Sequence, residues 1–113
     1  MVNRSAVLLK YKDPFVFWAN AVDPYDGNPE ITLEEANKDC TVYLISEDDA
    51  DKLEEWILLN FKQLFESELE DWYTDESLWP KKRTRTLFDK WFNIQCHSVL
   101  IDTVGGSIYD DEI

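Results

Sequence analysis

The feature that most constrains the fold is a long segment, residues 46–72, in which apolar residues recur every three or four positions. These positions are Ala50, Leu53, Ile57, Phe61, Leu64, Phe65, Leu69 and Trp72. Such spacing is typical of a helix that buries one face. Ser46 can cap its start, and the acidic residues that follow suit the positive end of the helix dipole. A straight helix of this length would extend about 39 Å, so we expect a break near residues 65–67.

The remaining segments predict short strands and helices around this long one. Runs of β-branched and aromatic residues predict strands, and shorter apolar patterns with capping residues predict helices. The expected strands are 6–11, 41–45 and 98–104, the expected helices are 15–21, 33–37 and 84–92, and a further turn is expected at 75–79. The order β-α-β-α-α-β predicts an α+β fold, a small sheet of at least three strands with helices packed on one face. We expect one domain over residues 1–113, with 107–113 as a frayed acidic tail.

The charge of the chain limits its partners. With 24 acidic and 11 basic residues, the formal net charge is -13. Residues 47–76 hold twelve of the acidic residues and only two basic ones. Because phosphate binding depends on lysine and arginine displacing counterions, we predict no direct binding to nucleic acid and none to membranes.

Two features that the sequence lacks indicate the cellular compartment. It has no apolar run of about 20 residues and no secretory signal pattern, so we expect a cytoplasmic protein. Its two cysteines, Cys40 and Cys96, are too few for a disulfide framework and are expected to be unlinked.

Catalytic patterns are weak. His97, the only histidine, follows Cys96 directly, and neighbours in a strand point to opposite faces, which makes a Cys-His pair geometrically poor. The acidic residues do not form a calcium-loop pattern, and Gly105-Gly106 precedes no long helix that could hold a phosphate. We therefore predict no metal, no cofactor and no catalytic residues, and favour a non-enzymatic protein. The enzyme alternative would place a small-molecule pocket near His97, with Tyr43 or Asp102 as polar groups.

Aromatic residues suggest an interaction surface. The chain has five Trp, five Tyr and six Phe, and several fall on or just after the acidic helix. Exposed aromatics beside carboxylates are typical of protein-binding surfaces. The predicted interaction residues are Glu54, Glu55, Trp56, Trp72, Tyr73 and Trp79. The competing interpretation is that all these aromatics close a small core.

The leading hypothesis is a protein-interaction or regulatory module whose acidic, aromatic-dotted helix binds a basic protein surface. An alternative is a nucleic-acid mimic, in which carboxylates stand in for phosphates and inhibit a DNA- or RNA-binding protein. Mimicry would require a continuous double row of carboxylates at phosphate spacing. We also expect self-association as a symmetric homodimer, because so many aromatics are hard to bury in one small domain.

One basic cluster interrupts the acidic sequence. It comprises Lys81, Lys82, Arg83 and Arg85. Because the cluster lies beside the strongly acidic segment, we expect it to face carboxylates, either at the end of the chain's own long helix or on a dimer partner.

Four sequence strings together cover much of the chain. They are AVLLKYKDPFVFWAN, TVYLISEDDADKLEEW, WYTDESLWP and CHSVLIDTVGG. On these strings the chain resembles a group of short, acidic, uncharacterised bacterial proteins. The resemblance implies a bacterial cytosolic protein and assigns no activity and no functional residues.

Overall fold

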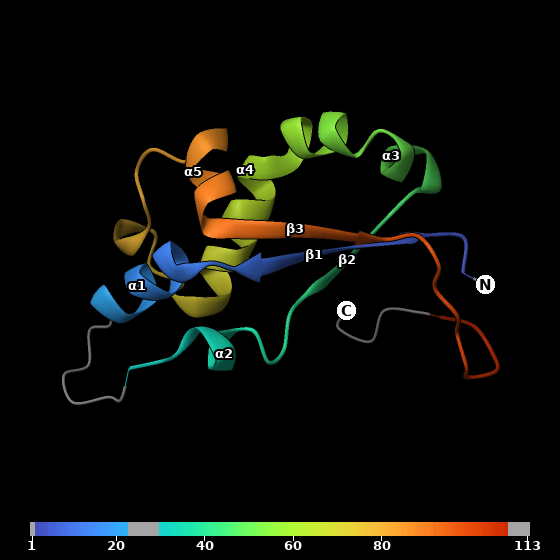
Figure 1. Cartoon of the computed structure of the whole chain (residues 1–113), viewed down its shortest axis with the longest axis horizontal. Helices are drawn as coiled ribbons and strands as arrows, with labels where there is room; N and C mark the ends of the chain where they lie inside the picture. Colours follow the sequence, from blue (N-terminus) through green and yellow to red (C-terminus); the bar gives the residue numbers. More distant parts are fainter. Residues whose placement is uncertain (1, 23–29, 109–113) are drawn as a thin grey trace.

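A three-stranded antiparallel sheet in the order β2-β1-β3 organises the chain (Figure 1). The computed structural model describes residues 2–22 and 30–108. The elements within them are β1 (Ser5–Tyr11), α1 (Asp13–Ala21), α2 (Leu33–Ala36), β2 (Val42–Ile45), α3 (Glu47–Asp51), α4 (Leu53–Trp72), the 3-10 helix η1 (Glu76–Leu78), α5 (Arg85–Trp91) and β3 (Phe92–His97). The predicted α+β class is confirmed. Of the predicted tail, residues 109–113 lie outside the described residues, and 107–108 are exposed.

The register of the sheet separates a buried face from a more open one. Val7 pairs with Tyr43 on β2 and with Cys96 on β3, whereas Leu8 pairs with Val42 and Gln95. Because side chains alternate along a strand, these two rows face opposite sides of the sheet. Val7 is fully buried, and Val42 is 51% exposed. One face of the sheet therefore carries the core, and the other is only partly covered.

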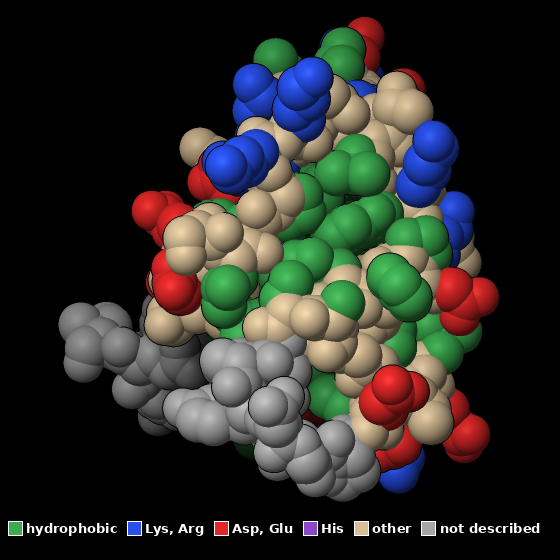
Figure 2. All heavy atoms as spheres, turned by 90° about the vertical axis from the view of Figure 1, so that its left-hand side faces the viewer, with side chains coloured by type: hydrophobic (Ala, Val, Ile, Leu, Met, Phe, Trp, Pro, Cys, Tyr) green, Lys and Arg blue, Asp and Glu red, His purple; other side chains and the backbone are tan. Residues whose placement is uncertain are grey.

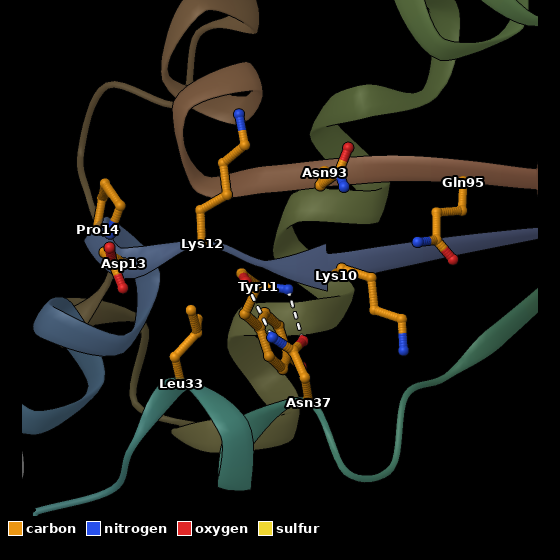
Figure 3. Close-up of a pocket in the computed structure, with 9 residues that line it drawn as sticks. All are labelled: Lys10, Tyr11, Lys12, Asp13, Pro14, Leu33, Asn37, Asn93 and Gln95. Carbon is orange, nitrogen blue, oxygen red and sulfur yellow. Dashed lines mark hydrogen bonds between the residues drawn. The ribbon is translucent and has the colours of Figure 1, made fainter.

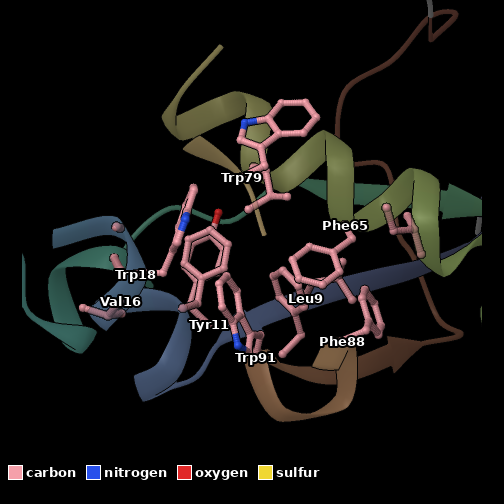
Figure 4. Packing of buried hydrophobic residues seen from close by; sticks show 14 of the residues in the cluster. Leu9, Tyr11, Val16, Trp18, Phe65, Trp79, Phe88 and Trp91 are labelled. Carbon is pink, nitrogen blue, oxygen red and sulfur yellow. The ribbon is translucent and has the colours of Figure 1, made fainter. Parts of the chain in front are cut away.

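The core packs α4 and α5 against the buried face. Val7 and Leu9 of β1 and Phe65 of α4 are almost completely inaccessible. Figure 4 shows Phe65, Phe88 and Trp91 gathered against Leu9, with Tyr11 and Trp18 beside them. The prediction that helices pack on one face of the sheet is thus confirmed for the helices that make the core.

Aromatic rings fill much of this core. Phe15 stacks on Tyr11 with ring centroids 4.2 Å apart, and it makes edge contacts with Trp18 and Trp91. Phe65 meets Phe92 edge-on at 5.4 Å. Such pairs add about 0.5–1.5 kcal/mol each beyond the area they bury, so the abundant aromatics stabilise the domain itself.

The third strand lies earlier than predicted. β3 spans Phe92–His97, whereas residues 98–104 form no strand and are mostly exposed. The sequence FNIQCH alternates apolar and polar residues, and its apolar members Phe92, Ile94 and Cys96 face the core. The predicted strand at 98–104 is therefore wrong, and α5 correspondingly ends at Trp91 instead of continuing through Phe92.

The break in the long helix is also elsewhere than predicted. The helix is interrupted at Lys52, where φ is -122° and ψ is 46°, and it continues unbroken through residues 65–67. The predicted cap is confirmed, since Ser46 Oγ accepts a hydrogen bond from the Asp49 backbone N–H at 3.1 Å. α4 alone has 20 residues, about 30 Å, which fits within the 46 Å long axis without a second break. None of the described helices is long and apolar enough to cross a membrane.

Candidate interaction surface

A groove separates strand β2 from helix α4. It has a volume of about 420 Å³. Its lining consists of Val42, Tyr43, Leu44, Ile45, Trp56, Asn60, Gln63 and Leu64. The first four are the whole of β2, and the other four form a stripe along α4, since residues three, four and eight apart share a helix face. The groove therefore follows a strand on one side and a helix on the other.

β2 is an edge strand. It pairs only with β1 in the sheet of the described residues. Edge strands present unpaired backbone N–H and C=O groups on their free side and are usually protected by charge or proline. β2 has neither, and its Val42 and Leu44 are 51% and 54% exposed.

Carboxylates lie at both ends of β2. Thr41, just before the strand, donates a hydrogen bond from Oγ1 to Asp71 Oδ2 at 3.4 Å. Beyond the other end, α3 carries Glu47, Asp48, Asp49 and Asp51, all exposed. None of these four α3 carboxylates forms an ion pair within residues 2–22 and 30–108. Their charge is consequently available to a partner.

A buried carboxylate lies behind the groove. Glu68 of α4 is only 2% exposed. Tyr11 donates its hydroxyl to Glu68 Oε1 at 2.6 Å, and Tyr43 donates its hydroxyl to Oε2. Trp72 Nε1–H in turn donates to the Tyr11 oxygen at 3.1 Å. This network fastens β1 and β2 to the same turn of α4.

Burial sets the protonation of the network. Loss of hydration raises the pKa of Glu68 above its usual value, although the two phenol donors oppose the shift. Burial, reinforced by the carboxylate, also raises the pKa of both tyrosines. The phenols therefore stay protonated and act as donors. Among the described residues, every buried side-chain nitrogen or oxygen has a hydrogen-bond partner. We interpret Glu68 as a structural group.

Glu68 is not among the residues predicted from the sequence, although a signal for its role is present there. The residue lies four positions after Leu64 and three after Phe65, on the side of the helix that carries the apolar stripe. A carboxylate on a buried stripe must find donors, because an unpaired buried charge is very costly. Tyrosines on the strands that face the helix could have been proposed as those donors.

The predicted interaction residues are divided by the structure. Trp56 lines the groove, and Glu54 and Glu55 lie beside it in the chain and are exposed. Trp79 is instead buried, 7% exposed, and its Nε1–H donates to the Tyr73 carbonyl at 2.7 Å. A surface role for Trp79 is therefore wrong, because the ring closes the core as the competing interpretation held.

Trp72 and Tyr73 occupy an intermediate position. Both are half-buried and pack against the core, and Tyr73 donates its hydroxyl to the Ala19 carbonyl at 2.6 Å. They also line a second cavity, of about 500 Å³, at the C-terminal end of α4. Carboxylates of Glu70, Asp71 and Asp75 share its lining. The two rings thus border acidic surface without being freely exposed.

The two arginines of the basic cluster pair with carboxylates of the chain itself, as expected, although only Glu54 lies at an end of α4, whereas Glu66 lies within α4 and Asp89 lies in α5. Arg85 pairs with Glu54 at 2.8 Å and with Asp89 at 2.8 Å, and these two carboxylates raise the pKa of its guanidinium. Arg83 lies 3.6 Å from Glu66 and sits over the Trp79 ring at 5.8 Å. The Arg85–Glu54 and Arg83–Glu66 pairs join the segment around α5 to α4.

The residues proposed for catalysis do not converge. Cys96 pairs with Val7 on the core side of the sheet, whereas His97 pairs with Ala6 on the other side and is exposed. Asp102 lies beyond β3 in the exposed segment, where it accepts a hydrogen bond from the Val104 backbone N–H. Cys40 and Cys96 are not bonded to each other. Within the described ranges, no group of three or more His, Cys, Asp or Glu residues is placed to hold a metal ion.

A third cavity, of about 630 Å³, lies where α2 meets the end of β1 (Figure 3). The Asn37 side chain bonds both backbone groups of Tyr11, accepting from N–H at 2.8 Å and donating to C=O at 3.0 Å. Lys10 and Lys12 reach the cavity, but Lys12 Nζ donates to the Asp89 carbonyl at 2.9 Å. The hydrogen bonds of Asn37 and Lys12 at this cavity are made to the backbone of the same chain. We therefore interpret the cavity as part of a structural junction between α2 and β1.

The end of the molecule near α1 carries an apolar patch. Figure 2 shows hydrophobic side chains at the centre of this face, with Lys and Arg mainly above and to the right of them and with Asp and Glu around the left, right and lower edges. Phe17 of α1 is 76% exposed. Among the described residues, this face is apolar at its centre and carries both signs of charge at its rim.

Comparisons with protein-family models, curated proteins and solved structures found no match for the chain.

Proposed function

We propose that the protein is a non-enzymatic interaction or regulatory module that binds a basic segment of a partner protein in the cytoplasm. The observation that carries this proposal is the apolar groove between β2 and α4, which has carboxylates at both ends of its strand. Such a surface combines apolar area, which supplies affinity, with charge, which selects and steers the partner.

The unpaired carboxylates support a basic partner. The α3 carboxylates have no ion-pair partner among the described residues, whereas Glu54 and Glu66 are paired with arginines of the same chain. Charges without an internal partner contribute most to attraction between molecules, because no internal cation offsets their field.

The carboxylate map does not favour nucleic-acid mimicry. Along α4, Glu68 is buried, and Glu54 and Glu66 are neutralised by Arg85 and Arg83. These residues interrupt the row of negative charges that would have to stand in for phosphates.

The site around His97 does not favour an enzyme. His97 lies on the side of the sheet away from the core and lines none of the three cavities described above. Tyr43, the proposed polar partner, is committed to Glu68. A catalytic site would need such groups to converge on one cavity.

The test is affinity capture from the native cell, with mass spectrometry, of the wild type and of a neutralised variant. The variant carries Glu47→Gln, Asp48→Asn and Asp51→Asn, which remove charge from α3 and keep side-chain size. The matched control carries Glu30→Gln, Glu34→Gln and Asp39→Asn, which remove the same charge from exposed positions elsewhere. We expect a basic partner that the wild type and the control retain and the α3 variant loses. Equal retention by all three proteins would contradict the proposal.

A further inference from the structure

We infer that β2 is a strand-addition site: an extended, basic segment of the partner pairs with the free edge of β2 and lies in the groove beside α4. This inference rests on the proposed function and specifies its binding mode. In strand addition, main-chain hydrogen bonds supply affinity, and pockets for alternate side chains supply specificity.

The two edges of the sheet differ in protection. The open-face residues of β3 are Asn93, Gln95 and His97, all polar, whereas those of β2 are Val42 and Leu44, both apolar and more than half exposed. A natural edge strand that carries exposed apolar residues and no charge is a template for pairing with another chain. β2 is therefore the edge suited to an added strand.

The shape of the groove favours an extended chain. All four residues of β2 contribute to its lining, so the groove follows the length of the strand. On the opposite wall, Trp56, Asn60 and Leu64 recur every fourth residue along α4. Trp56, which is half-buried, offers apolar contact to inward-facing side chains of an added strand, whereas Leu64 is only 6% exposed. Its alternate side chains would lie beside Val42 and Leu44 on the open side of the sheet.

Polar groups on the helix wall remain available. Asn60 donates from Nδ2 to the Trp56 carbonyl at 2.8 Å, which leaves its side-chain oxygen as an acceptor. Gln63 is exposed and forms no hydrogen bond within the described part of the chain. These two amides can bind polar groups of the added segment on its helix side.

The negative charges at the two ends of β2 indicate which residues should flank the central stretch of the bound segment. Asp71 lies at the Thr41 end of β2, and the α3 carboxylates lie beyond its Ile45 end. The expected ligand is therefore a β-branched stretch of about four or five residues, apolar at alternate positions, with Lys or Arg on both sides.

The same charge disfavours a second copy as occupant. The chain's own exposed apolar segment around Val99, Ile101 and Val104 has strand-forming residues, but Asp102 is its only charged residue. A second copy would also bring a net charge of -13 to an acidic surface. A basic partner avoids this repulsion.

We would titrate the 113-residue protein with a blocked nine-residue peptide, Arg-Lys-Val-Thr-Val-Thr-Val-Lys-Arg, and follow binding by backbone amide NMR and amide hydrogen exchange. A second peptide carries N-methyl groups on alternate backbone nitrogens, so that charge and side chains are kept and main-chain donors are lost. We expect shifts and slowed exchange centred on β2, and binding at least about tenfold weaker for the N-methylated peptide, equivalent to ~1.4 kcal/mol.

Two matched variants test the groove. Gln63→Trp fills it from an exposed helix position, and we expect at least about tenfold weaker binding. Leu59→Trp adds the same ring on the same helix at a position that is 83% exposed and does not line the groove, and it should bind like the wild type. Thermal melts of both variants verify folding.

Several results would overturn strand addition. They are equal binding of both peptides, no effect of Gln63→Trp, no binding of any peptide, or a dimer in sedimentation that dissociates when residues 98–108 are deleted. Equal binding of both peptides that is lost in the α3 variant would leave the proposed function standing and remove only the strand. Conversely, β2-centred binding of a peptide with Glu in place of Lys and Arg would keep the strand site and contradict a basic partner.

Discussion

The two sides of α4 differ in how deeply their side chains are buried. On the core side, Phe65 is fully buried among aromatic rings of α5 and β3. On the groove side, Trp56 is only half-buried and Asn60 and Gln63 face an open edge strand. One helix therefore completes a core along one face and leaves a strand edge accessible along another.

The comparison shows where stability and binding reside. Buried residues on the core side remove apolar surface from water and leave no buried side-chain polar atom unpaired in the described structure. The groove side retains apolar area and unpaired backbone groups, which cost stability in the isolated domain but can be satisfied by a partner. Substitutions on the two sides should consequently affect different measurements.

The largest effect should come from the centre of the core. Phe65→Ala removes a fully buried ring that contacts Phe88, Trp91 and Phe92, and should lower the free energy of unfolding by about 3–5 kcal/mol. Leu59→Ala on the same helix is the control, and it should change the free energy of unfolding by less than about 0.5 kcal/mol. Urea denaturation measures both. Similar losses for the two variants would contradict the assignment of the faces.

The Glu68 network should give the next largest effect. Glu68→Ala leaves the Tyr11 and Tyr43 hydroxyls without their carboxylate acceptor, and should cost about 1–3 kcal/mol. Glu70→Ala removes an exposed carboxylate two residues away and should cost less than about 0.5 kcal/mol. If denaturant melts show no difference between the two, the network does not fasten the strands to α4.

The pH dependence of stability provides a sharper test of the same network. Because burial raises the pKa of Glu68 in the folded state, the folded protein binds more protons than the unfolded chain as pH rises above 4.5. The contribution of Glu68 therefore falls from that pH up to its raised folded value, by about 1.4 kcal/mol for each unit of pKa difference. We expect the stability of Glu68→Gln, relative to the wild type, to increase over this range in unfolding experiments. A constant difference from acidic to neutral pH would show that the carboxyl group titrates normally.

The smallest effect should come from the arginines that join α5 to α4. Replacing Arg83 and Arg85 with glutamate breaks their pairs with Glu66, Glu54 and Asp89. Partly exposed pairs contribute about 0–1 kcal/mol each, and salt screens them. The variant should therefore be modestly less stable than the wild type, and this difference should decrease at high salt.

The wild-type protein should also show no binding to random oligonucleotides at physiological salt. Micromolar binding that disappears in the variant would make the basic cluster a functional site.

Sequence patterns predicted the long helix, its Ser46 cap and the first two strands because each follows from local spacing. They failed where two local signals competed. The β-branched run at 98–104 outweighed the alternation of Phe92, Ile94 and Cys96, and only pairing with β1 decides between them. The break at Lys52 could not be predicted from a helix-breaking residue, because no glycine or proline lies there.

The candidate site was predictable only in part. The acidic surface around α3 and the position of Trp56 beside it follow from composition and spacing. The groove does not, because it exists only where the edge of β2 lies against α4. Trp79 was misplaced for the same reason, since helix spacing cannot reveal that its indole donates to the Tyr73 carbonyl.

The central position of β1 has a consequence for the order of events during synthesis. β1 is made first, yet one of its two neighbours, β3, comes from residues 92–97. On the ribosome, β1 and β2 would emerge with the buried face of the sheet uncovered, and the three-stranded sheet could form only after residues 92–97 had also emerged. Folding that waits for such distant pairing is slow and exposes the nascent chain to aggregation. Chaperones that bind apolar segments are therefore expected to engage this chain before residue 97 leaves the exit tunnel.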